Sequence, residues 1–99
     1  MRLTEQQIDT IRSETAKAFG TNAQVRLFGS RVDDTRRGGD IDLHIETDLQ
    51  GGEAQRAADR LYVALIHKLG DQRIDIITHT IGTPKRTIDD MATRTGQVL

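Results

Sequence analysis

Two aspartates separated by one residue, Asp40 and Asp42, are the side chains with the clearest chemical potential in this sequence. They begin a run, residues 40–46, in which polar and apolar residues alternate, as is typical of a strand with one apolar face. Because residues i and i+2 of a strand point to the same face, the two carboxylates project side by side, about 5–7 Å apart. Such a pair repels itself unless a cation lies between, and Mg²⁺ prefers carboxylate and phosphate oxygens. The pattern therefore predicts a magnesium site of the kind that assists phosphoryl chemistry.

A glycine–serine step, Gly29-Ser30, lies nine residues before Asp40 and follows a short alternating segment, residues 24–28, that reads as a strand. Glycine allows the backbone to come close to a ligand, and a serine at the start of a helix offers a hydroxyl and free N–H groups to a phosphate. The polar loop 33–39 would then return the chain to the acidic strand. We expect the phosphate-binding turn and the metal pair to lie together.

A third carboxylate, Asp75, occurs in the later segment RIDIITH, residues 73–79, which also reads as a strand. Strand parity places Asp75 on one face with Ile77 and His79. If this strand neighbours the Asp40 strand, Asp75 joins the same metal site. As the third carboxylate, it is the candidate that helps to deprotonate an attacking hydroxyl.

Helices are expected before, between and after these strands. The first runs from about residue 5 to residue 19, with Thr4 as N-cap, Gln7 completing a capping box and Gly20 as its stop. The second runs over about residues 53–69, after a break at Gly51-Gly52.

A last short helix begins at Thr83-Pro84, as N-cap and first helical residue, and continues to about Arg94. Val98-Leu99 either packs back on the sheet or frays. The alternation of helical and strand periods predicts an α+β fold, a small mixed sheet flanked by helices, as one domain spanning residues 1–99.

For the remaining polar and aromatic side chains we expect surface or core positions without a role in chemistry. His44 and Glu46 are expected on an exposed strand face, and Tyr62 on the apolar stripe of the second helix, in the core with its hydroxyl at the rim. Six basic side chains are expected at the surface without a ligand role: Arg36, Arg37, His67, His79, Lys85 and Arg86. No His or Cys spacing suggests zinc.

The overall charge is close to neutral, with 14 Lys and Arg against 15 Asp and Glu, so nonspecific nucleic-acid binding as the main activity is not favoured. The chain contains no cysteine, which excludes disulfides and thiolate metal sites. We find neither a signal-peptide pattern nor an apolar run of the roughly 20 residues that cross a bilayer. These features predict a cytoplasmic protein.

The combination of Gly29-Ser30, a nine-residue gap, Asp40-x-Asp42 and a later strand aspartate, Asp75, resembles the DNA polymerase β-like nucleotidyltransferase superfamily. Within it, the chain is similar to the minimal nucleotidyltransferases of bacteria. The resemblance covers most of the chain, from the first predicted strand through the third. Arg31 matches an arginine that directly follows the serine in many members.

This resemblance implies a nucleotidyltransferase fold and two Mg²⁺ ions held by Asp40, Asp42 and Asp75 as the catalytic and metal-binding carboxylates. It implies that Gly29, Ser30 and Arg31 bind the nucleotide, with ATP as substrate. Two departures affect the loop contacts. Many members carry a small residue, Arg and Gly where this chain has residues 32–34, VDD, and a serine where it has Gly39.

The function that the resemblance implies is transfer of a nucleoside monophosphate, AMP by analogy, onto an acceptor hydroxyl. Minimal members commonly pair with a small helical HEPN-type toxin, and several adenylylate a tyrosine of that toxin, so a type VII-like antitoxin is expected. Two alternatives stay open. The chain could neutralise a partner by contact alone, or it could modify a small molecule, although relatives of that kind usually carry an extra acceptor domain.

Overall fold

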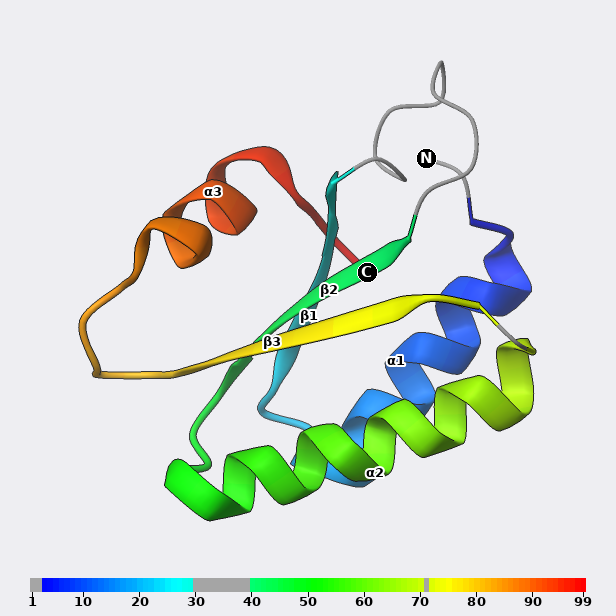
Figure 1. Ribbon diagram of the computed structural model, residues 1–99, viewed down its shortest axis with the longest axis horizontal. Coiled ribbons are helices and arrows are strands. Elements are labelled where there is room, and N and C mark those ends of the chain that lie inside the picture. The colour runs from blue at the N-terminus through cyan, green and yellow to red at the C-terminus, as the bar shows by residue number, and fades with distance from the viewer. Residues whose placement is uncertain (1–2, 30–39, 71) are drawn as a thin grey trace.

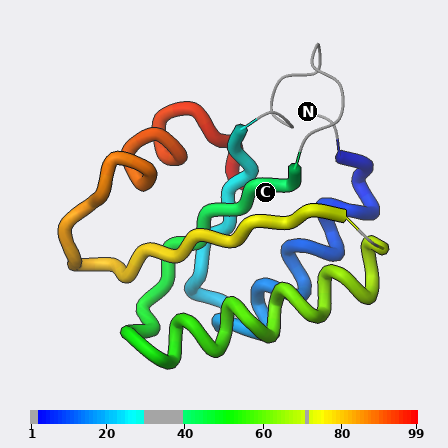
Figure 2. Tube along the Cα trace, viewed as in Figure 1, coloured from blue at the N-terminus to red at the C-terminus, as the bar shows by residue number. Residues whose placement is uncertain are grey.

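The computed structural model describes residues 3–29, 40–70 and 72–99 of the chain. In these ranges it contains three helices and four strands, which run α1 (Glu5–Phe19), β1 (Gln24–Phe28), β2 (Ile41–Thr47), α2 (Gly51–Leu69), β3 (Ile74–Thr80), α3 (Thr87–Thr95) and β4 (Gln97–Val98). Figure 2 follows the same path as a single tube. The predicted α+β class, a small mixed sheet flanked by helices, is confirmed.

The sheet has the strand order β3-β2-β1-β4. Strand β1 pairs antiparallel with both β2 and β4, whereas β2 and β3 are parallel. Two parallel neighbours need a long crossover connection, and α2 supplies it here. This crossover brings two acidic segments that are far apart in sequence into adjacent strands, with Asp42 directly opposite Asp75.

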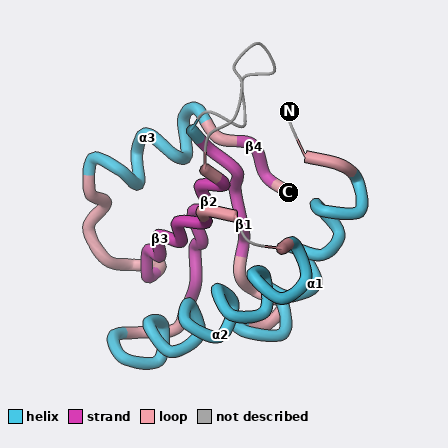
Figure 3. Tube along the Cα trace, turned by 45° about the vertical axis from the view of Figure 1, so that its right-hand side comes forward, coloured by secondary structure: helices cyan, strands magenta, loops and turns pink. Residues whose placement is uncertain are grey.

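The helices cover the two faces of the sheet unequally. Helices α1 and α2 lie side by side against one face, and α3 lies on the other (Figures 1 and 3). The core forms between the sheet and the helix pair, where Leu27, Leu43 and Ile45 are fully buried, together with Ile11 and Leu61 from the helices. The opposite face carries the polar residues of β2.

Local capping signals place α1 where the sequence predicts it. Thr4 Oγ1 accepts from the Gln7 amide at 3.1 Å, and the Gln7 side chain accepts from the Thr4 amide at 2.9 Å. Gly20 ends the helix with φ +93°, a conformation that other residues rarely adopt. The prediction for β1, residues 24–28, is also confirmed.

The starts of the other two helices differ from prediction. Gly51 and Gly52 are the first residues of α2 instead of a break before it. Gly51 has φ +52°, which glycine adopts without strain, and the first N–H groups of a helix have no partner within the helix. Helix α3 begins at Thr87, not at Pro84. Its start is fixed by Asp89, whose Oδ2 accepts from the Arg86 amide at 2.8 Å.

Two further expectations are settled by packing. Tyr62 is 45% exposed, so its expected place in the core is wrong, because the buried stripe of α2 passes through its neighbour Leu61 and through Leu65. The chain end packs back on the sheet: β4 pairs with β1, and the Leu99 amide donates to the Val25 carbonyl at 3.0 Å. Within the described ranges, none of the helices is both long and apolar enough to cross a membrane.

Candidate metal site

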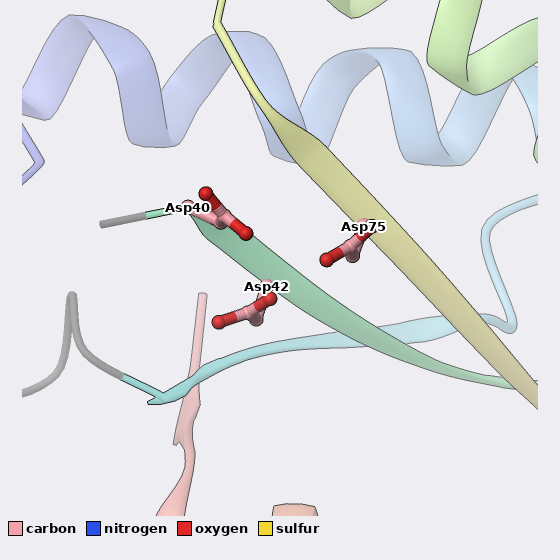
Figure 4. A group of neighbouring side chains, drawn as sticks. All are labelled: Asp40, Asp42 and Asp75. Carbon is pink, nitrogen blue, oxygen red and sulfur yellow. The ribbon is translucent and has the colours of Figure 1, made fainter.

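Three carboxylates meet at one end of the parallel strand pair. Asp40 directly precedes β2, Asp42 lies within it, and Asp75 is the second residue of β3. Each side chain offers one oxygen, and these oxygens all lie within 4.8 Å of one another (Figure 4). The sequence predicts that Asp75 joins the other two aspartates only if the two strands are neighbours. They are: β2 and β3 pair, with Asp42 opposite Asp75.

The three carboxylates create an unfavourable concentration of negative charge. Burial, followed by the neighbouring charges of Asp75 and Asp40, raises the pKa of Asp42 above its ordinary value. Among the described cations, Arg73 pairs with the cluster, and its Nε lies 3.6 Å from Asp40 Oδ1. Arg73 is 88% exposed, and an exposed pair of this kind contributes little. The cluster therefore favours a further cation.

The donor set fits a hard divalent cation. All three side chains offer oxygen, and no His nitrogen belongs to the group. Mg²⁺ is bound by one or a few carboxylates and completes its shell with water and phosphate oxygens. Asp75 is exposed, and Asp40 and Asp42 are half-buried, so the cluster is open to a ligand from solvent. Asp40, Asp42 and Asp75 are the residues that would hold such an ion.

Gly29 lies at the end of β1, directly beside this cluster. It adopts φ +78°, and a Cβ placed on it would overlap the carboxylate of Asp42. Strand pairing explains the proximity, because the preceding Phe28 is the register partner of Asp42. The position requires glycine for its conformation and for its close approach to the acidic residue. Its predicted contact with a nucleotide stays a prediction.

Several predicted residues lie outside the described part of the chain. Ser30 and Arg31, predicted to bind the nucleotide, belong to this group, as do Arg36 and Arg37. Their predicted contacts are therefore not tested by the geometry.

His44 is buried, not exposed, which corrects the expectation for this strand position. The ring is 0% exposed because α3 covers this part of the polar face, and Nε2 lies 2.8 Å from Oδ1 of the equally buried Asp89. Arg86 also donates to Asp89, from Nε at 2.9 Å and Nη2 at 3.0 Å. The ring of Phe28 meets His44 edge-on at 6.5 Å. This network fixes α3 on the sheet beside the carboxylates.

The balance of charges in this network leaves Asp89 ionised. Burial raises its pKa, but hydrogen bonds from Arg86 and His44 outweigh burial and hold the pKa of Asp89 well below its ordinary value. The same contact raises the pKa of Arg86. Arg86 is exposed, as expected, but its guanidinium is bound to Asp89 instead of being freely solvated. Asp89 was missed in the sequence, although its place three residues after an N-cap position is a recognised capping signal.

His79 is also buried, against the expectation of a surface position. Its Nδ1 lies 2.8 Å from Glu46 Oε2, and its Nε2 lies 3.1 Å from the Thr83 carbonyl. Both partners are acceptors, so the geometry suits an imidazolium that donates from both nitrogens. Glu46 is consequently engaged rather than freely solvated. His67 and Lys85 are exposed, as expected.

No protein-family model matches the chain, and no curated protein matches it as a relative. The resemblance to minimal nucleotidyltransferases therefore depends on the sequence motif, with the arrangement of the three carboxylates as its structural counterpart.

Proposed function

We propose that the protein is a Mg²⁺-dependent nucleotidyltransferase that transfers AMP from ATP to an acceptor hydroxyl. The observation that supports the proposal most is the meeting of Asp40, Asp42 and Asp75, each with an oxygen within 4.8 Å of the others, beside a glycine turn. Enzymes of phosphoryl transfer depend on such carboxylates to hold metal ions against phosphate oxygens.

Each residue has a role in this proposal. Asp40 and Asp42 would hold the cation, and Asp75 would both complete the set and accept the proton of the attacking hydroxyl. That oxygen forms a bond to the α-phosphorus as the bond to pyrophosphate breaks, and the proton passes through Asp75 to solvent. Asp75 suits this role because it is the exposed member of the cluster. Bound Mg²⁺ would supply charge neutralisation for the triphosphate.

We assign the turn at Gly29 to the substrate phosphates. Its backbone lies directly against the Asp42 carboxylate with no side chain between them, so a phosphate bound by that backbone would also lie near the carboxylates. Ser30 and Arg31 follow directly in the chain, and we assign them to the β- and γ-phosphates.

We assign the acceptor to a partner protein. Asp75 is the exposed member of the carboxylate cluster, so a hydroxyl carried by another protein could reach it from solvent. A helical HEPN-type toxin that presents a tyrosine hydroxyl fits this need, which makes the protein an antitoxin of the type VII kind.

The test is incubation of a host lysate with α-labelled ATP, Mg²⁺ and purified protein, in parallel with Asp42→Asn. A labelled protein band that appears only with the wild type supports transfer to a protein. Label in a small molecule keeps the chemistry and changes the acceptor. If no label appears and Asp42→Asn still protects cells from the toxin, contact alone is the function. Failure of the folded wild type to bind ATP with Mg²⁺ overturns the proposal.

A further inference from the structure

One edge of the sheet is formed by a strand that also carries part of the carboxylate cluster. Strand β3 is outermost in the order β3-β2-β1-β4, and Asp75 is its second residue (Figure 1). The strand is seven residues long, whereas β4 at the other edge has two. An edge strand presents unpaired backbone donors and acceptors, to which a segment of another chain can bind. The free backbone groups of β3 therefore decide whether it can bind one.

Alternate residues of β3 direct their backbone groups away from β2. The Ile81 amide donates to the Thr47 carbonyl at 2.8 Å, and the Arg73 carbonyl accepts from the Ile41 amide at 2.9 Å. Odd-numbered residues of the segment 73–81 therefore face β2, and the even-numbered residues between them face outward. The outward-facing residues of β3 are Ile74, Ile76, Thr78 and Thr80.

The second half of this edge is capped by the protein itself. Arg86 Nη2 donates to the Thr78 carbonyl at 2.6 Å. The Thr80 carbonyl accepts from the Thr83 amide at 3.1 Å and from Thr83 Oγ1 at 2.7 Å. These donors belong to the segment that leads to α3. Edge strands are commonly protected in this way, and the capped half of β3 is closed to a further strand.

The first half of the edge, beside the carboxylates, is open. The backbone N–H and C=O of Ile76 have no hydrogen-bond partner within residues 3–29, 40–70 and 72–99. Ile76 is half-buried with its side chain against the core, and its neighbour Asp75 is exposed. Backbone groups at such a position bind water or another strand. The open part of the edge thus adjoins the carboxylate that we assign to the attacking hydroxyl.

A segment that pairs antiparallel with this edge would place one residue directly opposite Asp75. Because Asp75 directs its backbone groups toward β2, this pair would lack hydrogen bonds of its own, with Cα atoms about 4.5 Å apart and both side chains on one face of the sheet. A serine or threonine hydroxyl there would lie beside the Asp75 carboxylate, and the longer tyrosine side chain would extend past it toward Asp42. Strand addition can therefore bring an acceptor hydroxyl to the carboxylates.

We propose that the partner protein presents its acceptor hydroxyl in an extended segment, which adds to β3 as an antiparallel strand hydrogen-bonded to Ile76. The inference rests on the proposed nucleotidyl transfer and specifies how its protein substrate binds. The hydrogen bond from Arg86 to Thr78 ends the open edge and so limits the segment to a few residues. Backbone pairing supplies the affinity, and the position opposite Asp75 selects the residue that is modified.

The first test is a titration of ¹⁵N-labelled protein with the peptide acetyl-KTVYVTK-amide, without ATP or Mg²⁺. Its tyrosine and threonines share one face, and its valines direct their backbone groups toward β3 when the tyrosine lies opposite Asp75. We expect saturable amide shifts, largest at Ile76 and Thr78, with a Kd on the order of 1 mM. The proposal is overturned if these amides do not shift at about 10 mM peptide.

Two methylated peptides provide matched controls of equal charge and side chains. Methylation of both valine nitrogens removes the donors that face β3 and should weaken binding about tenfold or more, whereas methylation of both threonine nitrogens, which face away, should leave binding unchanged. Equal binding of the two peptides would contradict strand addition. Amide shifts at Ile76 that depend on protein concentration without peptide would assign the edge to a second copy of this chain, which also overturns the proposal.

A change in the protein tests the same contact. Ile76→Pro removes the outward-facing N–H and leaves the ladder with β2 intact, because proline is tolerated at such edge positions. It should abolish the peptide shifts, and Ile76→Val, which keeps the amide, should bind as the wild type does. If Ile76→Pro does not fold, the two methylated peptides decide the question.

Transfer of label from ATP to the peptide in the presence of Mg²⁺ separates this inference from the proposed function. We expect label on the tyrosine of the unmodified and threonine-methylated peptides, and about tenfold less on the valine-methylated peptide. Equal labelling of all three keeps the chemistry and overturns strand addition. Peptide that binds at Ile76 in the expected pattern but takes up no label supports strand addition and counts against nucleotidyl transfer.

Discussion

The backbone of Gly29 lies against the carboxylate of Asp42, so closely that a Cβ at residue 29 would overlap Asp42 Oδ2. Gly29 also has φ +78°, which L-residues rarely adopt. Residue 29 must therefore be glycine for two separate reasons: its backbone has a positive φ, and a side chain there would collide with Asp42 on the neighbouring strand. Alanine substitutions at Gly29 and at Gly20 can distinguish the effect of the backbone conformation from the effect of the contact with Asp42.

Gly29→Ala should destabilise the protein by about 1–3 kcal/mol because of the strained backbone, and should also abolish nucleotidyl transfer because Asp42 is displaced. Gly20→Ala is the matched control. Gly20 has φ +93°, but a Cβ there meets no atom within 4 Å, so this variant should lose similar stability and keep its activity. Urea unfolding and the labelled-ATP assay measure both quantities. Equal activity of the two variants would contradict a role for the Gly29–Asp42 contact.

Asp42→Asn should change stability in opposite directions with and without Mg²⁺. The raised pKa of Asp42 means that folding favours its protonated form, so its ionisation costs stability as the pH rises above about 3.8. At pH 7 without metal, Asp42→Asn should therefore have a higher Tm than the wild type. With Mg²⁺ at 100 times its Kd, the wild type should gain about 2.7 kcal/mol that the variant does not.

The control for this change is Asp48→Asn, an exposed aspartate beyond the end of β2. Its stability should respond to Mg²⁺ as that of the wild type does. Thermal unfolding at two Mg²⁺ concentrations suffices for the comparison. An equal Mg²⁺ response in Asp42→Asn and wild type would remove Asp42 from the metal site.

The elements that the sequence predicted well are those specified locally. A capping box at Thr4 and Gln7 and a glycine stop define α1, and strict alternation defines β2. The meeting of Asp42 with Asp75 is different, because it depends on which strands become neighbours. Periodicity gives the face of each strand, but only the crossover through α2 gives the pairing.

The wrong expectations concern residues on the polar face of the sheet, which a later helix covers. Strand parity placed His44 and His79 correctly on the face of the acidic residues, but that face was expected to be solvated. Helix α3 and its preceding loop cover the part that carries the histidines, so both are buried, His44 against Asp89 and His79 against Glu46. Nothing in the alternation of β2 or β3 indicates that a later helix returns to this face.

The pair of His79 and Glu46 should make stability depend on pH near neutrality. The hydrogen bonds that His79 donates to the Glu46 carboxylate and to the Thr83 carbonyl outweigh burial and raise the pKa of His79 above its ordinary value of 6.5. A raised pKa means that its stabilisation is complete below pH 6.5 and is lost as the pH rises through the folded value. The charges of Glu46 and Asp89 act on it, and Arg86 Nη2 donates to the carbonyl of the adjacent Thr78.

His79→Gln should therefore cost about 1–3 kcal/mol at acidic pH and progressively less at alkaline pH. Unfolding by urea from about pH 5 to about pH 9 measures this difference. His67→Gln, on the exposed side of α2, should differ little from the wild type across the range. A constant difference between His79→Gln and wild type would show that His79 contributes by packing and not by its charge.

Asp89→Asn should be the most destabilising of these substitutions while it leaves the metal site intact. Asp89 is fully buried and accepts from His44 and from Arg86, and an asparagine would turn an amide donor toward these donors. Loss of one partner of a buried charge pair costs about 3 kcal/mol. Asp90→Asn, at the exposed next position of α3, should change stability by less than about 0.5 kcal/mol.

The pH and Mg²⁺ dependence of Asp89→Asn distinguish anchoring of α3 from catalysis. Because the pKa of Asp89 is lowered, its contribution is present above about pH 3.8 and is lost as the pH falls further, so the cost of the variant should shrink in acid. Asp89 does not belong to the carboxylate cluster, so the stabilisation by Mg²⁺ should persist in the folded variant. Loss of that stabilisation would instead mean that α3, through His44, holds Asp42 in the geometry that binds the ion.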